Sequence, residues 1–128
     1  MGQNKKVDKL LNVTTIIEFD YMCKDRKVAH VIANSRKNLV IQDVYTDHFL
    51  DAPMPQDRKD MFTLMKFFED RCFPRTRANC DELLKELGLK EYNPYLICIK
   101  TRGQQWDDFY WIRFKGDIVE YKDIKLRD

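Results

Sequence analysis

The stretch "TRGQQWDDFYWIRF", residues 101–114, decides how this fold closes, because it holds two tryptophans, three other aromatic residues and two adjacent carboxylates. Successive side chains of a strand point to opposite faces. Phe109 and Trp111 would then share one face, and Tyr110 would lie on the other face beside Ile112. We therefore predict a strand over residues 109–114 whose rings fill a core, in preference to rings that stack on nucleic-acid bases.

Asp107 and Asp108 precede that strand and raise the question of an acidic working pair. Two carboxylates could hold a hard metal ion or supply an acid and a base. Neighbouring positions on a strand point apart, however, and neither a third carboxylate nor a histidine lies at a recognisable metal spacing. We favour a structural interpretation, in which Asp107 caps a short turn and Asp108 accepts hydrogen bonds or pairs with an arginine. Trp106, outside the strand, is the best candidate for an exposed contact residue.

The first third of the chain has the pattern of strands. Ile17, Phe19 and Tyr21 alternate with acidic residues in "TTIIEFDYMC", which is the period-two signature of a half-buried strand. The segments "VAHVIA" (28–33) and "LVIQDVY" (39–45) follow after the polar turns "KDRK" and "NSRKN". These three segments predict an antiparallel meander.

Helical patterns follow once the segment "DAPMP" has interrupted the strand pattern. The segment "QDRKDMFTLMKFFEDRCF" has apolar residues at helical spacing, and Pro74 ends it. A second helix is expected over residues 76–87. A third, short helix should begin at Asn93 as N-cap, with Pro94 in its first turn and Gly103 just past its end.

The chain of 128 residues and 15.5 kDa has the size of one domain and can bury a core without disulfides or metals. Its 44% hydrophobic and 12% aromatic residues exclude a disordered chain. We predict a single α+β domain over residues 1–128, with an N-terminal antiparallel meander, about three helices and a C-terminal strand returning to the sheet. Residues 1–12 and 117–128 are expected to be flexible or edge arms.

The charge and the cysteines bear on partners and compartment. A formal net charge of +2, from 23 basic and 21 acidic residues, is weak evidence against a nucleic-acid binder. The four cysteines are far apart without a CxxC pair, and no secretory signal or run of roughly 20 apolar residues is recognisable. We therefore expect a cytoplasmic protein with reduced thiols and no membrane contact.

Catalytic and cofactor motifs are not recognisable in the sequence. It has no glycine-rich phosphate loop and no GxSxG, HExxH or EF-hand pattern. His30 and His48 stand apart from any serine or cysteine motif, so we interpret both as structural. We accordingly predict a protein that is not an enzyme and that carries no cofactor and no metal.

Arg71, Arg75 and Arg77 lie within seven positions next to a helix end and form the most distinctive basic cluster. They could clamp a phosphate or a carboxylate, or they could be solvated charges of which one pairs with Asp108 or Glu69. The sequence leaves both interpretations open. Arginine and aromatic residues are enriched at binding hot spots, so the predicted binding surface consists of Arg71, Arg75, Arg77, Trp106, Asp107 and Asp108.

The chain from Phe67 to Phe114 contains an aromatic-rich helix ending in an arginine and "FP", then a leucine-bearing helix closed by "LGL", a "TRG" turn and the ending "DDFYWIRF". In this it resembles a short module found with HipA-like kinases and in stand-alone proteins of bacterial mobile elements. The resemblance implies a small α+β unit that serves as a regulatory, partner-contacting surface. Kinase activity is not implied, because the chain has no room for a kinase lobe and no HRD or DFG motif.

Two functional hypotheses follow. The first is a non-catalytic protein-interaction or regulatory module with a protein partner, in a mobile-element or toxin–antitoxin-like setting. The second is a nucleic-acid-linked role, either by direct binding through the arginine cluster and Lys5, Lys6 and Lys9, or as a phage-type inhibitor of a defence nuclease. Such an inhibitor would need contiguous acidic surface, which could come from Asp107, Asp108, Asp81, Glu82 and Glu86.

Overall fold

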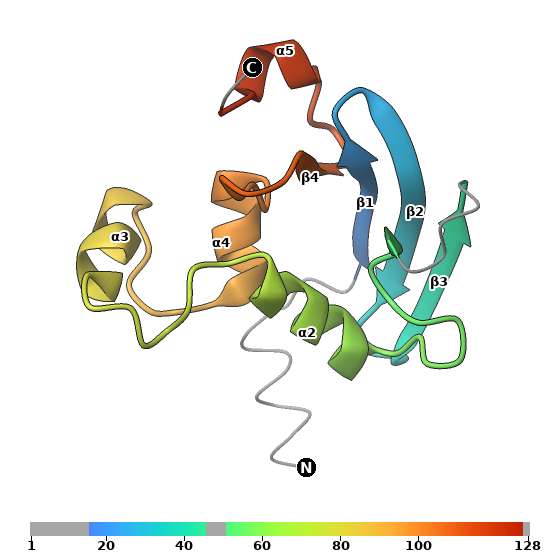
Figure 1. Cartoon of the computed structure of the whole chain (residues 1–128). Helices are drawn as coiled ribbons and strands as arrows, with labels where there is room; N and C mark the ends of the chain where they lie inside the picture. Colours follow the sequence, from blue (N-terminus) through green and yellow to red (C-terminus); the bar gives the residue numbers. More distant parts are fainter. Residues whose placement is uncertain (1–15, 46–50, 127–128) are drawn as a thin grey trace.

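The computed structural model of the chain describes residues 16–45 and 51–126 and has an α+β architecture. A four-stranded antiparallel sheet has the strand order β3-β2-β1-β4 (Figure 1). The predicted N-terminal meander and the returning C-terminal strand are both confirmed. The expected arm over residues 1–12 and His48 lie outside the described residues. The strands are β1 (Ile16–Cys23), β2 (Arg26–Asn34), β3 (Leu39–Val44) and β4 (Tyr110–Phe114).

The register of the sheet separates the apolar and the acidic residues of β1. Phe19 lies opposite Phe114 of β4, whereas Asp20 lies opposite His30 of β2 and Arg113 of β4. Residues that are directly opposite in a ladder point to the same face. One face of the sheet is therefore apolar and the other carries paired charges.

The three expected helices are present but shorter than their apolar patterns. They are α2 (Met61–Asp70), α3 (Cys80–Glu86) and α4 (Pro94–Thr101). α2 begins late because Asp60 is its N-cap, with a side-chain oxygen that accepts from the Thr63 N–H at 2.8 Å. α4 begins as predicted, since the Asn93 side chain accepts from the Leu96 N–H at 3.2 Å.

The segment 117–128 was expected to be flexible or an edge arm; the structure describes it as far as residue 126, and this part contains the short helix α5 (Tyr121–Ile124). An ion pair ties this segment down, with Arg102 Nε at 2.8 Å from a carboxylate oxygen of Asp117. The Gln104 side chain adds a hydrogen bond of 2.8 Å to the Ile124 carbonyl. A helix of four residues is too short for a periodic apolar pattern, which explains why the sequence did not reveal it.

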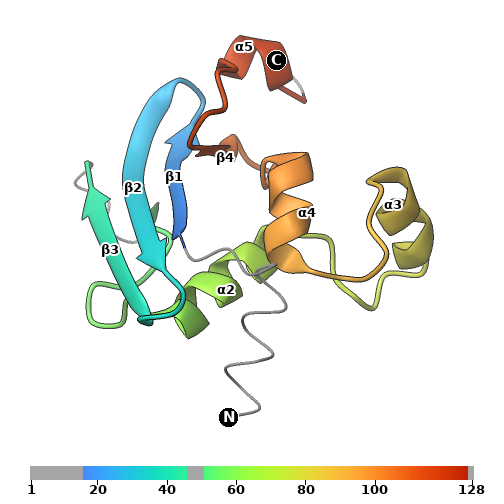
Figure 2. The ribbon, with the colours of Figure 1, turned by 180° about the vertical axis from the view of Figure 1, so that it is seen from behind.

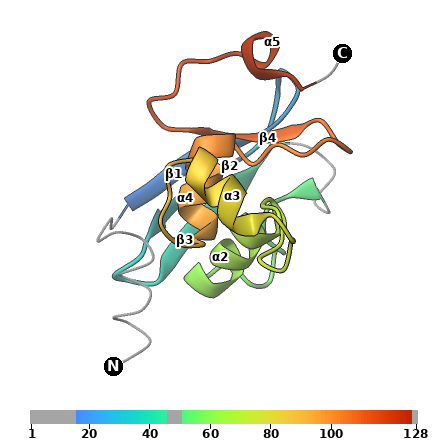
Figure 3. The same ribbon diagram turned by 90° about the vertical axis from the view of Figure 1, so that its left-hand side faces the viewer.

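The core lies between the apolar face of the sheet and the helices, which share one side of it (Figures 1 and 3). Phe19 is at its centre, with ring centroids 5.6 Å from Phe68 and 5.9 Å from Phe67. Burial of each such side chain contributes about 1.5–3 kcal/mol. A smaller cluster of Cys80, Leu84 and Ile97 joins α3 to α4.

We call the other face of the sheet the outer face. The helices α2, α3 and α4 do not cover it, and the view from behind in Figure 2 shows them gathered to one side of the strands. Its one closed end holds Met22 and Trp111, which are opposite each other and buried. The β1–β2 hairpin bends over them after an irregularity between Tyr21 and Met22. The Trp111 Nε1–H donates to the Lys24 carbonyl at 2.8 Å and holds this bend.

Gly103 is the glycine on which the closure of the core depends. Its φ is +63°, and an added Cβ would lie 2.8 Å from Cδ1 of Ile112, which is fully buried. Gly88 has a comparable φ of +76°, but nothing lies within 4 Å of its added Cβ. Gly88→Ala should cost about 1–2 kcal/mol of left-handed strain, and Gly103→Ala should add about 1–3 kcal/mol of overpacking.

Urea unfolding of the two alanine variants and the unmodified chain measures this difference. Equal losses in the free energy of unfolding for Gly103→Ala and Gly88→Ala would contradict the packing argument.

Candidate functional site

Arg71 is buried and holds the last strand against α2. It is 8% exposed, and its Nη1 and Nη2 donate to the two carboxylate oxygens of Asp108 at 2.8 and 3.0 Å. Nη2 also donates to the Tyr110 carbonyl at 3.0 Å, and Nε donates to the Gly103 carbonyl at 2.9 Å. The structure pairs Asp108 with Arg71, and not with Arg75 or Arg77, which we had expected Asp107 or Asp108 to hold.

The Arg71–Asp108 pair is a structural element, because all three guanidinium nitrogens of Arg71 donate to acceptors of the protein. Burial alone would lower the pKa of Arg71, but the hydrogen bonds to Asp108 outweigh it and raise that pKa. This arrangement turns two of the six residues of the predicted binding surface, Arg71 and Asp108, toward each other. It also separates the two aspartates, because Asp107 is exposed.

The other predicted surface residues are exposed, as expected for contact residues. Trp106 is 67% exposed. The Arg75 guanidinium lies 4.7 Å from the ring centroid of Tyr92, which is a cation–π distance. Among the residues that the structure describes, no hydrogen bond, ion pair or ring contact joins Arg75 or Arg77 to Trp106 or Asp107. These exposed residues therefore do not form one built site.

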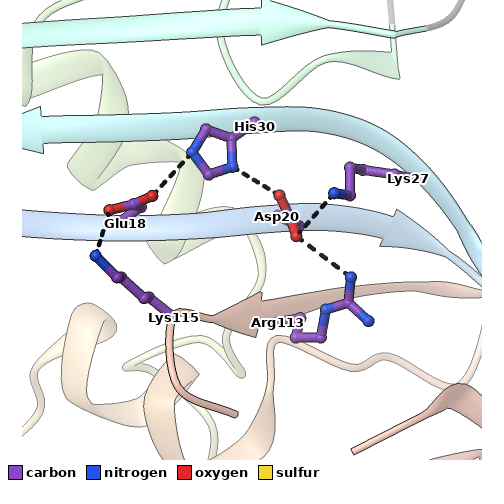
Figure 4. Close-up of polar contacts among 6 residues, drawn as sticks. All are labelled: Glu18, Asp20, Lys27, His30, Arg113 and Lys115. Atoms are coloured by element: carbon purple, nitrogen blue, oxygen red, sulfur yellow. Dashed lines mark hydrogen bonds and ion pairs between the residues drawn. The ribbon is translucent and has the colours of Figure 1, made fainter. Parts of the chain in front are cut away.

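A polar network on the outer face was missed by the sequence analysis (Figure 4). His30 lies between two carboxylates of β1, with Nδ1 at 2.7 Å from Asp20 and Nε2 at 3.1 Å from Glu18. Arg113 and Lys27 reach Asp20 at 3.3 and 3.5 Å. Lys115 reaches Glu18 at 3.4 Å. Figure 4 shows the six side chains in one row of contacts across three strands, and we call them the His30 network.

The His30 network is closed on itself. Burial would raise the pKa of Asp20, but the hydrogen bond from His30, the charge of Lys27 and the hydrogen bond from Arg113 lower it. Both ring nitrogens of His30 face carboxylate oxygens of β1 and are therefore engaged within the network. A shallow depression of about 230 Å³ lies beside the network, between β1 and the segment after β4. The charged residues that line this depression are already paired, Asp117 with Arg102 and the others within the His30 network.

Apolar side chains occupy the open end of the outer face. Ile16, Leu39 and Ile41 are each about half exposed, and Tyr45 follows β3 with similar exposure. In the register, Asn34 of β2 lies between Ile16 and Leu39, and Ile41 lies opposite Ile32 of β2. We call Ile16, Leu39 and Ile41 the apolar row. Large apolar side chains that gather on one exposed face are typical of interaction sites, whereas scattered ones are not.

The thiols do not form a reactive site. Sγ of Cys72 lies 3.7 Å from Sγ of Cys98, and Cys98 is buried. The contact with Cys72 and burial both raise the pKa of the Cys98 thiol. A buried thiol with a raised pKa is a poor nucleophile.

Within residues 16–45 and 51–126, no group of three or more His, Cys, Asp or Glu side chains is placed to hold a metal ion. None of the helices in this part of the chain has the length and apolar character needed to cross a bilayer.

Comparison of the chain with models of protein families, with curated proteins and with solved structures finds no match. The resemblance of residues 67–114 to the module of HipA-like kinases therefore stays a prediction.

Loss of the Arg71 side chain should be strongly destabilising. Arg71→Met leaves Asp108, whose side chain is 28% exposed, without its cation, and the loss of this charged hydrogen-bond partner should cost about 1–3 kcal/mol. Arg77→Met is the matched control, because Arg77 is exposed on the loop before α3 and should change stability by less than about 0.5 kcal/mol. The free energy of unfolding in urea distinguishes the two, and similar values for both variants would show that the pair is not structural.

Acid should weaken the Arg102–Asp117 pair. The hydrogen bond from Arg102 holds the pKa of Asp117 below the ordinary value of an aspartate, in spite of burial. The unfolded chain then binds this proton more readily, so the contribution of Asp117 is complete above about pH 5 and is lost as the pH falls through the lowered pKa. The difference in unfolding free energy between the unmodified chain and Asp117→Asn should be constant from about pH 5 to 7 and shrink below about pH 4. A difference that grows on acidification would contradict this assignment.

Proposed function

We propose that this chain is a non-catalytic protein-interaction module that binds a protein partner through the outer face of its sheet. The observation that carries the proposal is the apolar row, in which Ile16 of β1 and Leu39 and Ile41 of β3 are half exposed on the same face of the sheet. A partner that covered this row would remove apolar surface from water at about 25 cal/mol per Å².

The charges of the outer face favour a protein partner over a nucleic acid. Lys27, Arg113 and Lys115 each contact a carboxylate of β1, so their charges are offset before any ligand arrives. Phosphate binding relies on cations that are free to replace counterions. For this reason we do not advance the nucleic-acid-linked hypothesis further.

The setting of the proposed module follows from the sequence. The resemblance over residues 67–114 motivates a regulatory role beside a separate partner, in a mobile-element or toxin–antitoxin-like system. We propose a cytoplasmic location, because thiols kept apart as at Cys23 and Cys80 suit a reducing compartment.

Ile16→Glu tests the proposed surface. The chain, immobilised through a tag, should retain one stoichiometric protein from the lysate of its native cell. The glutamate places a charge in the apolar row, so the dissociation constant of the purified pair should rise at least about tenfold, equivalent to about 1.4 kcal/mol. Isothermal titration calorimetry measures this change.

Ile118→Glu is the matched control, because Ile118 is 94% exposed on the segment after β4 and the change in side chain is the same. It should leave the affinity unchanged. Arg75→Ala combined with Trp106→Ala tests the surface expected from the sequence. Binding that survives Ile16→Glu and is lost in the double variant would overturn the outer-face proposal in favour of that surface.

A further inference from the structure

The free edge of β3 presents a row of backbone groups that the sheet does not use. The Tyr45 N–H donates to the Val28 carbonyl of β2 at 2.8 Å. In an antiparallel ladder the direction of the backbone groups alternates along the strand. The continuous β2–β3 register therefore turns the N–H and carbonyl groups of Leu39, Ile41 and Asp43 toward β2. It turns those of Val40, Gln42 and Val44 away from the sheet.

The opposite edge of the sheet, at β4, is closed. The Tyr110 N–H donates to Asp108 at 3.0 Å, and the Tyr110 carbonyl accepts from Arg71 at 3.0 Å. The Ile112 N–H donates to the Arg102 carbonyl at 2.7 Å. Within the described part of the chain, no comparable backbone bond reaches Val40, Gln42 or Val44 from the outer side of β3.

β3 also lacks the features by which proteins protect a free edge. Natural edge strands are short, or they carry lysine, proline or a bulge that discourages pairing. β3 has the sequence LVIQDV over six residues, and its ladder with β2 has no irregularity. Its one charge is Asp43. Two of its side chains, Leu39 and Ile41, belong to the apolar row at this same edge.

We propose that a second copy of this chain pairs with β3, antiparallel and about a two-fold axis at Gln42. In this register Gln42 faces Gln42 of the second copy, and Val40 faces its Val44. All three outward-facing residues of each strand are then used, and each facing pair exchanges two backbone hydrogen bonds. The Gln42 side chain does not obstruct the axis, because it is held toward the core by Met54, whose backbone N–H and carbonyl both bond to it at 3.0 Å.

The side chains of the outer face fit this register. Leu39 lies opposite Tyr45 of the second copy, and such aromatic–aliphatic pairs stabilise antiparallel strands. Ile41 lies opposite Asp43 of the second copy. The same edge with the same spacing occurs on both copies, so a second copy satisfies it symmetrically, as isologous dimers do. The two sheets become one, and the two apolar rows meet across the axis. This dimer does not require the partner proposed above.

Two substitutions of opposite charge at Ile41 test the pairing and its register. Ile41→Glu places a carboxylate opposite Asp43 of the second copy, twice across the axis, and should convert the dimer into a monomer. Ile41→Lys places an ammonium group there and should keep the dimer. Ile16→Glu is the control, because Ile16 is as exposed as Ile41, at 50% and 51%, but lies two strands away from the edge. It should leave the dimer intact while it weakens the partner binding proposed above.

Sedimentation velocity and light scattering of the full chain, from about 1 µM to about 1 mM, give the mass of each variant over the range of weak association. Circular dichroism checks that each variant is folded. Hydrogen exchange of the unmodified chain gives a second readout that needs no variant. The amides of Val40, Gln42 and Val44 should exchange more slowly at the high concentration than at the low one.

A monomeric mass at every concentration would overturn the proposal, and so would a dimer that persists in Ile41→Glu. A dimer that is lost equally in Ile41→Glu and Ile41→Lys would overturn the register centred on Gln42. Exchange at the three amides that does not depend on concentration would exclude β3 as the interface. Loss of partner binding alone, with the dimer retained, would affect the proposed function and leave this inference standing.

Discussion

The guanidinium group of Arg71 is the interaction on which the rest of this structure depends. A buried cation is tolerated where its donors are satisfied, and those of Arg71 reach the Asp108 carboxylate and the carbonyl groups of Gly103 and Tyr110. Arg71 ends α2, whereas its three acceptors belong to the loop after α4 and the start of β4. One side chain therefore fastens the helices to the last strand. The same contacts exclude Asp108 from acid–base work, since its two oxygens are already occupied.

This closure makes the sheet asymmetric at its edges and at its faces. The groups that hold Arg71 also satisfy the backbone of β4, so that edge cannot accept another strand. The helices cover the apolar face, and the hairpin bend over Trp111 closes one end of the outer face. What stays open is the far end of the outer face and the edge of β3. These two regions are the parts of the sheet that stay available for contacts with other molecules.

The sequence predicted the parts of this arrangement that depend on local patterns. Alternation revealed the meander and the strand of Trp111, and the Asn93 cap located the start of α4. It did not identify Arg71 as the partner of Asp108, because only the long-range fold brings these two residues together. The His30 network was missed for the same reason. His30 contacts Asp20 and Glu18 because of the register between β1 and β2, and this register cannot be read from the order of residues along the chain.

The pairing of charges on the outer face also bears on where a partner can sit. Covering the His30 network would remove its ion pairs from water without offering them new partners, and that desolvation costs more than it returns. Protein interfaces place such groups on a hydrated rim and apolar side chains at the centre. The apolar row should therefore form the centre of any interface, with Glu18 and Lys115 at its margin. Leu39 and Ile41 belong both to this row and to the open edge of β3. Pairing of a second copy at that edge would therefore extend the apolar surface that the row offers to a partner.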